Sequence, residues 1–211
     1  MKLYDLTHLL NNESPVYPGI PAPRFTPSAT IDENRYRETK FQFHSHLGTH
    51  IDAPAHMLQN GLSLDQMKIE SFRGNALVIC ISVNEKRITK KTIQNFEKEL
   101  PNIDFVLFKT GWSRFWGNEK YFDEFPVLDS YALEYLLSFK LKGIGFDTIS
   151  ADPMNSADYK NHFSIFEKGM LIIENLVFPH GFNETIGDFS CFPLYYKNAD
   201  GSPVRAIFQT I

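Results

Sequence analysis

Four of the chain's seven histidines lie in one short run, residues 41–56, together with a carboxylate. From residue 44 to residue 56 the histidines and Asp52 occupy even positions, while apolar residues such as Leu47 and Ile51 occupy odd ones. In an extended chain this period of two puts the imidazoles and the carboxylate on one face. Neutral imidazole and carboxylate are the ligands of Zn²⁺, Mn²⁺ and Fe²⁺. The run therefore predicts a metal site rather than a solvated strand that is rich in histidine by chance.

The same run must bend before its side chains can meet. Fully extended, it would hold His46 and His50 roughly 13 Å apart, too far to share one ion. Gly48 can adopt backbone angles that are closed to other residues, and Pro54 fixes its own φ. We therefore expect the chain to turn at these two positions.

A second group of candidate residues follows about a hundred positions later. Residues 156–169 have the pattern of a helix that is capped by Ser156 and followed by Gly169, and His162 lies on it. A lone helical histidine is more often a partly buried polar group than a ligand. Glu174 interrupts an apolar run, where an ionised carboxylate costs several kcal/mol unless a cation or several donors compensate it. An Arg or Lys partner, or an outward position on an edge strand, remains the alternative to a metal.

The surrounding elements alternate between strands and helices. Apolar or alternating runs predict strands at residues 3–7, 25–31, 36–43, 75–83, 105–112, 143–147 and 203–211. Helical spacing predicts helices at residues 89–100 and 129–139, and a short helix after Ser63. This order predicts an α/β fold: one domain over residues 1–211, with a mixed β-sheet flanked by helices. Functional sites lie beyond the strand ends in such sheets, so we expect Thr110, Trp112 and Asp147 near the pocket.

Composition excludes several classes of protein. The 211 residues show no internal repeat or linker, and 43% hydrophobic with 22% charged residues is typical of a globular domain. A net charge of −4 offers no basic footprint for nucleic acid. The N-terminus has no secretory pattern and no run approaches the roughly 20 apolar residues that a bilayer needs, so we expect a cytoplasmic protein. Two cysteines make no disulfide framework, and Cys80, within an apolar run, is expected in the core.

The eleven residues from His46 to His56 resemble a known family signature without a break: His-x-Gly-Thr-His-x-Asp-x-Pro-x-His. The signature is that of the cyclase family of metal-dependent hydrolases, whose members include bacterial kynurenine formamidase (arylformamidase) and, more distantly, isatin hydrolase. Asp152-Pro153, Ser156, His162 and Glu174 resemble the second half of the same site. The resemblance implies a fold of the swivelling β/α/β type.

The resemblance also implies a two-metal site, most simply two Zn²⁺, with Mn²⁺ as the alternative. Five residues would hold the ions, with Asp52 shared and Glu174 bridging: His46, His50, Asp52, His162 and Glu174. His56 is left free as the catalytic proton-transfer residue. The implied reaction is hydrolysis of an amide bond by a metal-bound hydroxide, as in the conversion of N-formylkynurenine to kynurenine and formate in tryptophan catabolism.

Other implications concern the pocket and the partners. The resemblance makes Tyr17 a candidate wall of the substrate pocket, and implies a homodimer or higher homo-oligomer in which residues 14–27 reach a neighbour. Opening of a cyclic amide such as isatin, or of a lactone, needs the same metal ligands and proton-transfer residue, so it remains an alternative reaction. A non-catalytic metal-binding protein is a further alternative, although a surplus His56 and cavity walls from Tyr17 and Trp112 favour an enzyme. The role of His44 is open as well.

Overall fold

A large mixed sheet dominates the computed structural model, which describes residues 1–210; Ile211, the last residue of the predicted C-terminal strand and of the expected domain, lies outside them. Within the described residues nine strands form this sheet, in the order β1 (Leu3–Asp5), β13 (Ile207–Thr210), β11 (Ile186–Ser190), β5 (Arg73–Cys80), β7 (Phe105–Lys109), β9 (Gly143–Phe146), β10 (Leu171–Glu174), β4 (His50–Asp52) and β12 (Gly201–Pro203). The central strands β5, β7, β9 and β10 are parallel, and the flanking strands pair antiparallel. The predicted α/β fold with a mixed sheet is confirmed.

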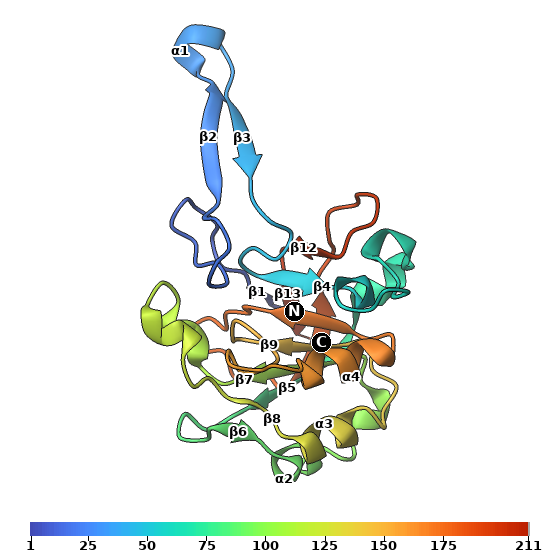
Figure 1. Cartoon of the computed structure of the whole chain (residues 1–211). Coiled ribbons are helices and arrows are strands. Elements are labelled where there is room, and N and C mark those ends of the chain that lie inside the picture. The colour runs from blue at the N-terminus through green and yellow to red at the C-terminus, as the bar shows by residue number, and fades with distance from the viewer. Residues whose placement is uncertain (211) are drawn as a thin grey trace.

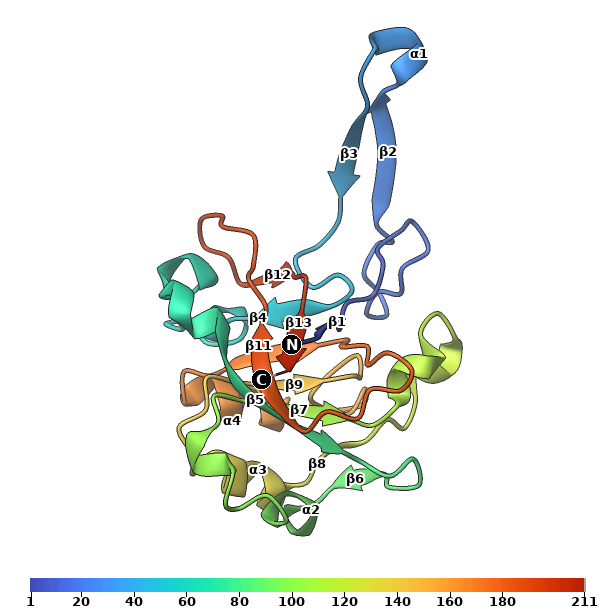
Figure 2. The same cartoon turned by 180° about the vertical axis from the view of Figure 1, so that it is seen from behind.

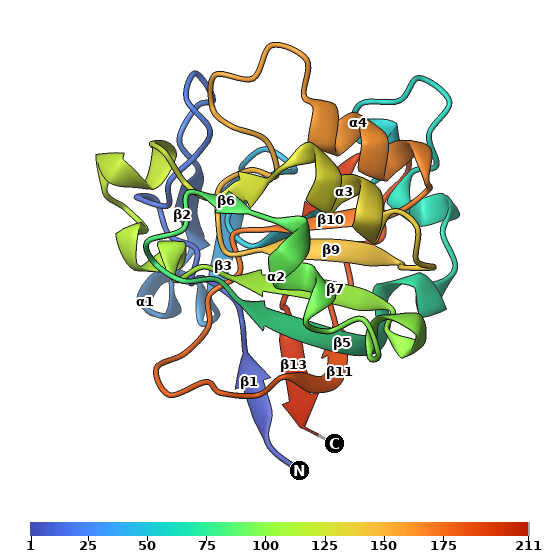
Figure 3. The ribbon, with the colours of Figure 1, turned by 90° about the horizontal axis from the view of Figure 1, so that it is seen from below.

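Both faces of the parallel strands are buried. Helices α2 (Lys90–Gln94), α3 (Ser130–Leu136) and α4 (Lys160–Glu167) cover one face (Figure 3), where Leu77 and Ile79 join the helix side chains in one cluster. Ala76 and Val78 face the other way, into a cluster with Phe189 and Phe208 from the antiparallel strands, because the sheet curls over itself (Figure 1). Burial on both faces explains why these strands read as continuous apolar runs.

A hairpin projects away from this body. It consists of β2 (Arg24–Ala29), a single helical turn α1 (Ile31–Asn34) and β3 (Glu38–Gln42), and both Figure 1 and Figure 2 show it standing clear of the sheet. Every residue of β3 is exposed. The projecting element therefore spans residues 24–42, whereas the sequence placed the arm at residues 14–27.

The remaining elements are short. Strands β6 (Arg87–Ile88) and β8 (Val127–Leu128) form a small second pair, and 3₁₀ turns occur at Pro54–His56, Leu64–Gln66, Ile69–Phe72, Leu100–Asn102, Trp112–Phe115 and Glu119–Phe122. The short helix expected after Ser63 is the 3₁₀ turn Leu64–Gln66, which begins with a capping box between Ser63 and Gln66. Among the helices of residues 1–210, none is long and apolar enough to cross a bilayer.

Several sequence expectations were wrong in detail. Cys80 is exposed, because it is the last residue of β5; only the preceding residues 76–79 of that strand are buried. Ser156 is not a helix cap: its hydroxyl accepts the N–H of Tyr159 in the preceding turn, and α4 begins at Lys160. The helix expected over residues 89–100 ends at Gln94. Of the expected strand 203–211, Pro203 is the last residue of β12, and β13 begins only at Ile207.

Candidate metal centre

The histidine-rich run bends at both expected positions. Gly48 has a φ of +60°, and a Cβ there would collide with the Leu10 side chain, so the turn before β4 requires glycine. Pro54 begins the 3₁₀ turn that carries His56. Between the two bends lies the three-residue strand β4, and His50 and Asp52 lie on the same face of it.

Strand pairing and one helix bring the distant residues to β4. Glu174 on β10 lies directly opposite His50, and Gly201 on β12 lies opposite Asp52 on the other side of β4. Helix α4 packs on β10 and carries His162. The four side chains at the centre are almost fully buried: His50, Asp52, His162 and Glu174.

Two carboxylates face three imidazole nitrogens in this centre. Oδ1 of Asp52 lies 2.6 Å from Nδ1 of His46 and 3.3 Å from Nε2 of His50. Glu174 places Oε2 3.4 Å from Nε2 of His50 and Oε1 3.3 Å from Nε2 of His162. Two overlapping groups result, each with ligand atoms within 4.8 Å of one another: His46, His50 and Asp52, and Asp52, His162 and Glu174. The structure thus brings together all five residues that the sequence named as ligands.

The second nitrogen of each of these rings has its own partner. Nδ1 of His50 donates to the carbonyl oxygen of Gly48 at 2.8 Å. Nδ1 of His162 lies 2.6 Å from Oδ2 of Asp152, and Nε2 of His46 lies 3.0 Å from Oδ2 of Asp200. Metal-binding histidines characteristically donate their other N–H to a carboxylate or a carbonyl. Each of the three rings therefore has an outer partner of the kind that metal-binding histidines have.

A buried atom of Asp52 tests whether a cation fits. Its Oδ2 is buried and, within the part of the chain that the structure describes, has no hydrogen-bond partner. Buried polar atoms are normally satisfied, and an orphaned carboxylate oxygen calls for an ion or a water. Three imidazoles, two carboxylates and an unsatisfied oxygen between them fit divalent metal ions of the zinc and manganese type.

The same geometry shifts the acid–base equilibria of the metal-free protein. Burial opposes protonation of His46, but Asp52 and Asp200 outweigh it and raise its pKa to about 9. Burial likewise opposes protonation of His162, but Asp152 and Glu174 raise its pKa to about 10. Hydrogen bonding by His46 lowers the pKa of Asp200 to about 2.

His56 differs from the other three histidines. Its ring lies beside that of His46, with centroids 4.0 Å apart, and its Nδ1 is 3.8 Å from Oδ2 of Asp200, beyond hydrogen-bond distance. Burial is the largest influence on its pKa and lowers it. At neutral pH the ring is therefore uncharged and able to accept a proton.

A cavity of about 510 Å³ opens onto the centre. Tyr17 and Ile20 from the N-terminal loop, and Tyr159 and Phe163 near α4, supply its aromatic and apolar walls above the histidines and carboxylates. Tyr17, the candidate wall implied by the resemblance, is among the residues that line this cavity. His44 is exposed, and it is absent from the lining.

The residues expected from the strand ends do not line this cavity. Trp112 instead packs beside Tyr121 and donates its indole N–H to the Tyr121 carbonyl at 3.0 Å. Asp147 accepts the N–H groups of Thr110 and Gly111, and burial raises its pKa to about 6. These side chains brace the loop after β7. Trp112 does not line the cavity, but it shares a hydrophobic cluster with Ile149, which does.

Of the two carboxylates next to the histidines, Asp200 was missed, whereas Asp152 was named through the resemblance but given no role. Asp152 accepts from the backbone N–H and the ring of His162, and Asp200 contacts His46. Their sequence contexts, Asp152-Pro153 and Asp200-Gly201, are typical of turns. A turn signal by itself does not reveal a contact with a histidine far away in the chain.

Comparison with known proteins gives consistent matches. The family model described as "Putative cyclase" matches residues 4–153. Kynurenine formamidase of Bacillus cereus (strain ZK / E33L) is 31% identical over 210 residues, which cover 98% of this chain and 97% of the relative. Isatin hydrolase A from Ralstonia solanacearum superposes with a TM-score of 0.89 at 25% identity, covering 100% of this chain and 92% of that one. A structure described as a potential metal-dependent hydrolase with cyclase activity gives a TM-score of 0.81 at 28% identity, covering 98% and 96% of the two chains.

Proposed function

The chain belongs to the Putative cyclase family, and we propose that it is a metal-dependent hydrolase that cleaves an amide bond outside peptides, converting N-formylkynurenine to kynurenine and formate. One observation carries the proposal. Three imidazoles, each locked by a partner on its other nitrogen, present their remaining nitrogens to two buried carboxylates at the base of a cavity. A site of this kind suits a small molecule that must reach a metal centre.

The proposed ligand set follows the two groups of side chains. His46 and His50 would hold one ion and His162 the other, and Asp52 and Glu174 would be shared between them. Imidazole with carboxylate favours Zn²⁺, and Mn²⁺ is the alternative. When bound, two divalent ions lower the pKa of water toward about 7 and polarise the carbonyl of a substrate.

His56 is the proposed proton-transfer residue. It lies at the cavity and outside the inner groups of ligands, and burial keeps its ring neutral at pH 7. A neutral imidazole can take a proton from the attacking water and return it to the nitrogen of the leaving amine. The aromatic walls at Tyr17 and Tyr159 would stack against the aryl group of that amine.

A cyclic amide is the second candidate substrate. The similarity to isatin hydrolase A extends over the whole described fold, and ring opening needs the same metal ligands and the same proton transfer. The cavity is large enough for either compound. A non-catalytic metal-binding protein is disfavoured, because such a site has no need of a cavity or of a surplus histidine.

A kinetic screen tests the proposed activity. The metal-free protein, reloaded with Zn²⁺ or Mn²⁺, is assayed with N-formylkynurenine, isatin and simple lactones, with the chelated protein as the control. We expect metal-dependent turnover that is highest with N-formylkynurenine. Preference for isatin would establish the second candidate, and no turnover of any of these compounds by fully loaded protein would reject both.

We also propose that the chain forms a homodimer or higher homo-oligomer through its projecting hairpin. The rings of Phe25 and Phe41 lie 5.4 Å apart, and Phe41 is 61% exposed. An isolated two-stranded hairpin is marginally stable in water, so a contact with a second copy would stabilise it.

Sedimentation should give a mass above the 24.3 kDa monomer. Phe41→Ser should weaken the assembly, whereas Tyr131→Ser, at an exposed aromatic on α3, should not. A monomer at micromolar concentration would contradict the proposal.

A further inference from the structure

Asp200 lies at the edge of the metal centre, although nothing in its local sequence marks it. It directly precedes β12, the edge strand that pairs with β4, so its place depends on the register that sets Gly201 opposite Asp52. A Cβ at Gly201 would come within 2.5 Å of Cε1 of the His46 ring. The backbone beside Asp200 therefore lies against that imidazole, and glycine leaves the space for it.

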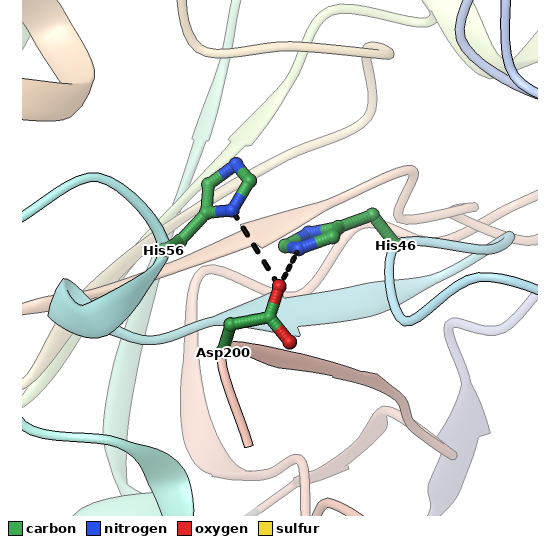
Figure 4. A group of neighbouring side chains, drawn as sticks. All are labelled: His46, His56 and Asp200. Atoms are coloured by element: carbon green, nitrogen blue, oxygen red, sulfur yellow. Dashed lines mark hydrogen bonds and ion pairs between the residues drawn. The ribbon is translucent and has the colours of Figure 1, made fainter. Parts of the chain in front are cut away.

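The carboxylate of Asp200 is held between two histidines. Figure 4 shows its Oδ2 between His46 and His56, 3.0 Å from Nε2 of His46 and 3.8 Å from Nδ1 of His56. Ser45 donates its hydroxyl to the same oxygen at 3.2 Å, and the hydroxyl of Tyr196 lies 3.4 Å from Oδ1. Four neighbours thus restrict the orientation of a carboxylate that is itself only partly buried.

The contact with His46 completes a pattern that the two deeper histidines share. His50 uses the Gly48 carbonyl and His162 uses Asp152 to fix one ring nitrogen, and each presents the other nitrogen to Asp52 or Glu174. For His46 the corresponding acceptor is Asp200, and the free nitrogen, Nδ1, faces Asp52 at 2.6 Å. Without Asp200, His46 would be the one of the three with neither a fixed tautomer nor a fixed ring.

We propose that Asp200 is a positioning residue: it accepts the Nε2–H of His46, directs Nδ1 of His46 toward the metal centre, and confines the ring of His56 beside it. The part that concerns His46 depends only on metal binding, whereas the part that concerns His56 depends on the proposed hydrolase function. Outer partners of metal-binding histidines typically contribute 10–100-fold to metal affinity.

The first experiment measures Zn²⁺ alone, without substrate. Binding constants and stoichiometry are determined by competition with a chromophoric chelator for the full-length protein, Asp200→Asn and Asp200→Ala. Asparagine keeps a carbonyl oxygen that can accept from His46, whereas alanine does not. We expect unchanged stoichiometry, a roughly 10-fold weaker affinity in Asp200→Asn and up to about 100-fold in Asp200→Ala.

Asp188→Asn is the matched control, because Asp188 forms its ion pair with Arg73 on the sheet, away from the site. It should leave affinity unchanged. Circular dichroism and the melting temperature of each metal-free variant separate a positioning role from misfolding. Equal affinities in the wild type and Asp200→Ala would overturn the proposal.

A different outcome would reassign Asp200. His46, His56 and Asp200 also lie close enough to form a cation site of their own. Loss of one whole ion in Asp200→Asn, with the affinity for the others unchanged, would make Asp200 a ligand and refute the positioning role. The affinity loss should also persist in a His56→Ala background, because the proposed contact acts on His46. These measurements stay interpretable if the protein hydrolyses none of the tested amides.

For His56 the readout is turnover of the metal-saturated enzyme. Asp200→Asn, measured at zinc concentrations that restore full occupancy, should still lower kcat while leaving KM nearly unchanged, because the ring of His56 is less confined. Full recovery of kcat at saturating zinc would limit the role of Asp200 to His46 and overturn the second half of the proposal.

Discussion

The site has a buried part and a solvent-accessible part. We call the buried part, His50, Asp52, His162 and Glu174, the floor, and the accessible part, His46, His56 and Asp200, the rim. The floor side chains are between 1% and 7% exposed, whereas those of the rim are 24%, 28% and 42% exposed. Water can satisfy rim groups but not floor groups, so the floor depends on its own members and on the ions that it would hold.

This difference separates the buried ligands from the accessible groups at their edge, where His46 is a proposed ligand and His56 is the proposed proton-transfer residue. A buried carboxylate that loses its partners leaves an uncompensated charge, and damage there should reach metal binding and stability together. A rim imidazole can exchange protons with solvent while it stays beside the reaction. Substitutions in the floor should therefore remove metal, and a substitution of His56 should remove turnover alone.

The largest expected effect is that of Asp52→Ala, because Asp52 belongs to both groups of ligands. We expect loss of most bound metal and a fall in turnover well beyond the 10–100-fold cost of disturbing an outer partner. Metal analysis and a turnover assay on the same preparation measure both. Glu174→Ala should behave alike. Full metal occupancy in both variants would contradict the contrast between floor and rim. Circular dichroism should show that both variants are folded, since a core of this size does not depend on metal.

His56→Ala should be the sharpest test of the rim. As a proton-transfer residue it should lose roughly 10² to 10⁴ in turnover and keep its metal. His50→Ala, in the floor, should lose metal and activity together. Metal loss in His56→Ala equal to that in His50→Ala would place His56 among the ligands and leave the proton transfer unassigned.

Asp152→Asn should weaken metal affinity by about 10–100-fold, and by more than Asp200→Asn, because the contact with His162 is buried and that with His46 is not. Chelator competition measures the affinities of both variants. Asp129→Asn is a suitable control, since Asp129 caps α3 and asparagine caps equally well. Equal losses from the two site variants would show that burial does not set the strength of these contacts.

The smallest effect is a pH dependence of the metal-free protein. Burial opposes protonation of His46 and His162, but neighbouring carboxylates raise the two pKa values to about 9 and about 10, above the 6.5 of an unfolded histidine. The stability that they contribute is therefore fully present below about pH 6.5 and is lost as the pH rises through 9 and 10. We expect the melting temperature of chelated protein to fall over this range, by about 2–4 °C for each kcal/mol.

Metal should reverse that trend, because an ion replaces the protons on the imidazoles. The melting temperature of the zinc-loaded protein should hold or rise between pH 6.5 and 9. Parallel curves with and without zinc would mean that the titrating histidines are not the ligands. Calorimetry in two buffers of different ionisation enthalpy should also show roughly three protons released as two ions bind at pH 7, one from each of His46, His50 and His162.

The sequence predicted the site and the strands wherever the residues that determine them are close together in the chain. The run from His46 to His56 carried its ligand types, its period and both of its bends, so the first half of the centre could be predicted. Glu174 stood out because an apolar run demands burial, and it is buried. The parallel strands could be predicted because both of their faces are covered and their sequences are apolar throughout.

The same reasoning failed where local pattern does not determine the environment. Cys80 reads as core, but the end of β5 exposes it. Trp112 follows a strand end, but it packs beside Tyr121 and is not among the residues that line the cavity. Ser156 has the form of a helix cap, but its hydroxyl serves a turn that delays α4 to Lys160. The surroundings of Cys80 and Trp112 depend on tertiary packing, whereas at Ser156 a local turn with Tyr159 replaced the helix cap.

Asp200 marks this limit most clearly. By sequence, Asp200-Gly201 is a turn, and the residue it contacts, His46, lies more than 150 positions away. Only the antiparallel pairing of β12 with β4 brings them together, and a slip of one residue in that register would turn the strand's side chains to the opposite face. The sequence by itself determined which side chains could bind metal. The register of strands that close this sheet decided which of them meet, because that pairing depends on the packing of the whole core.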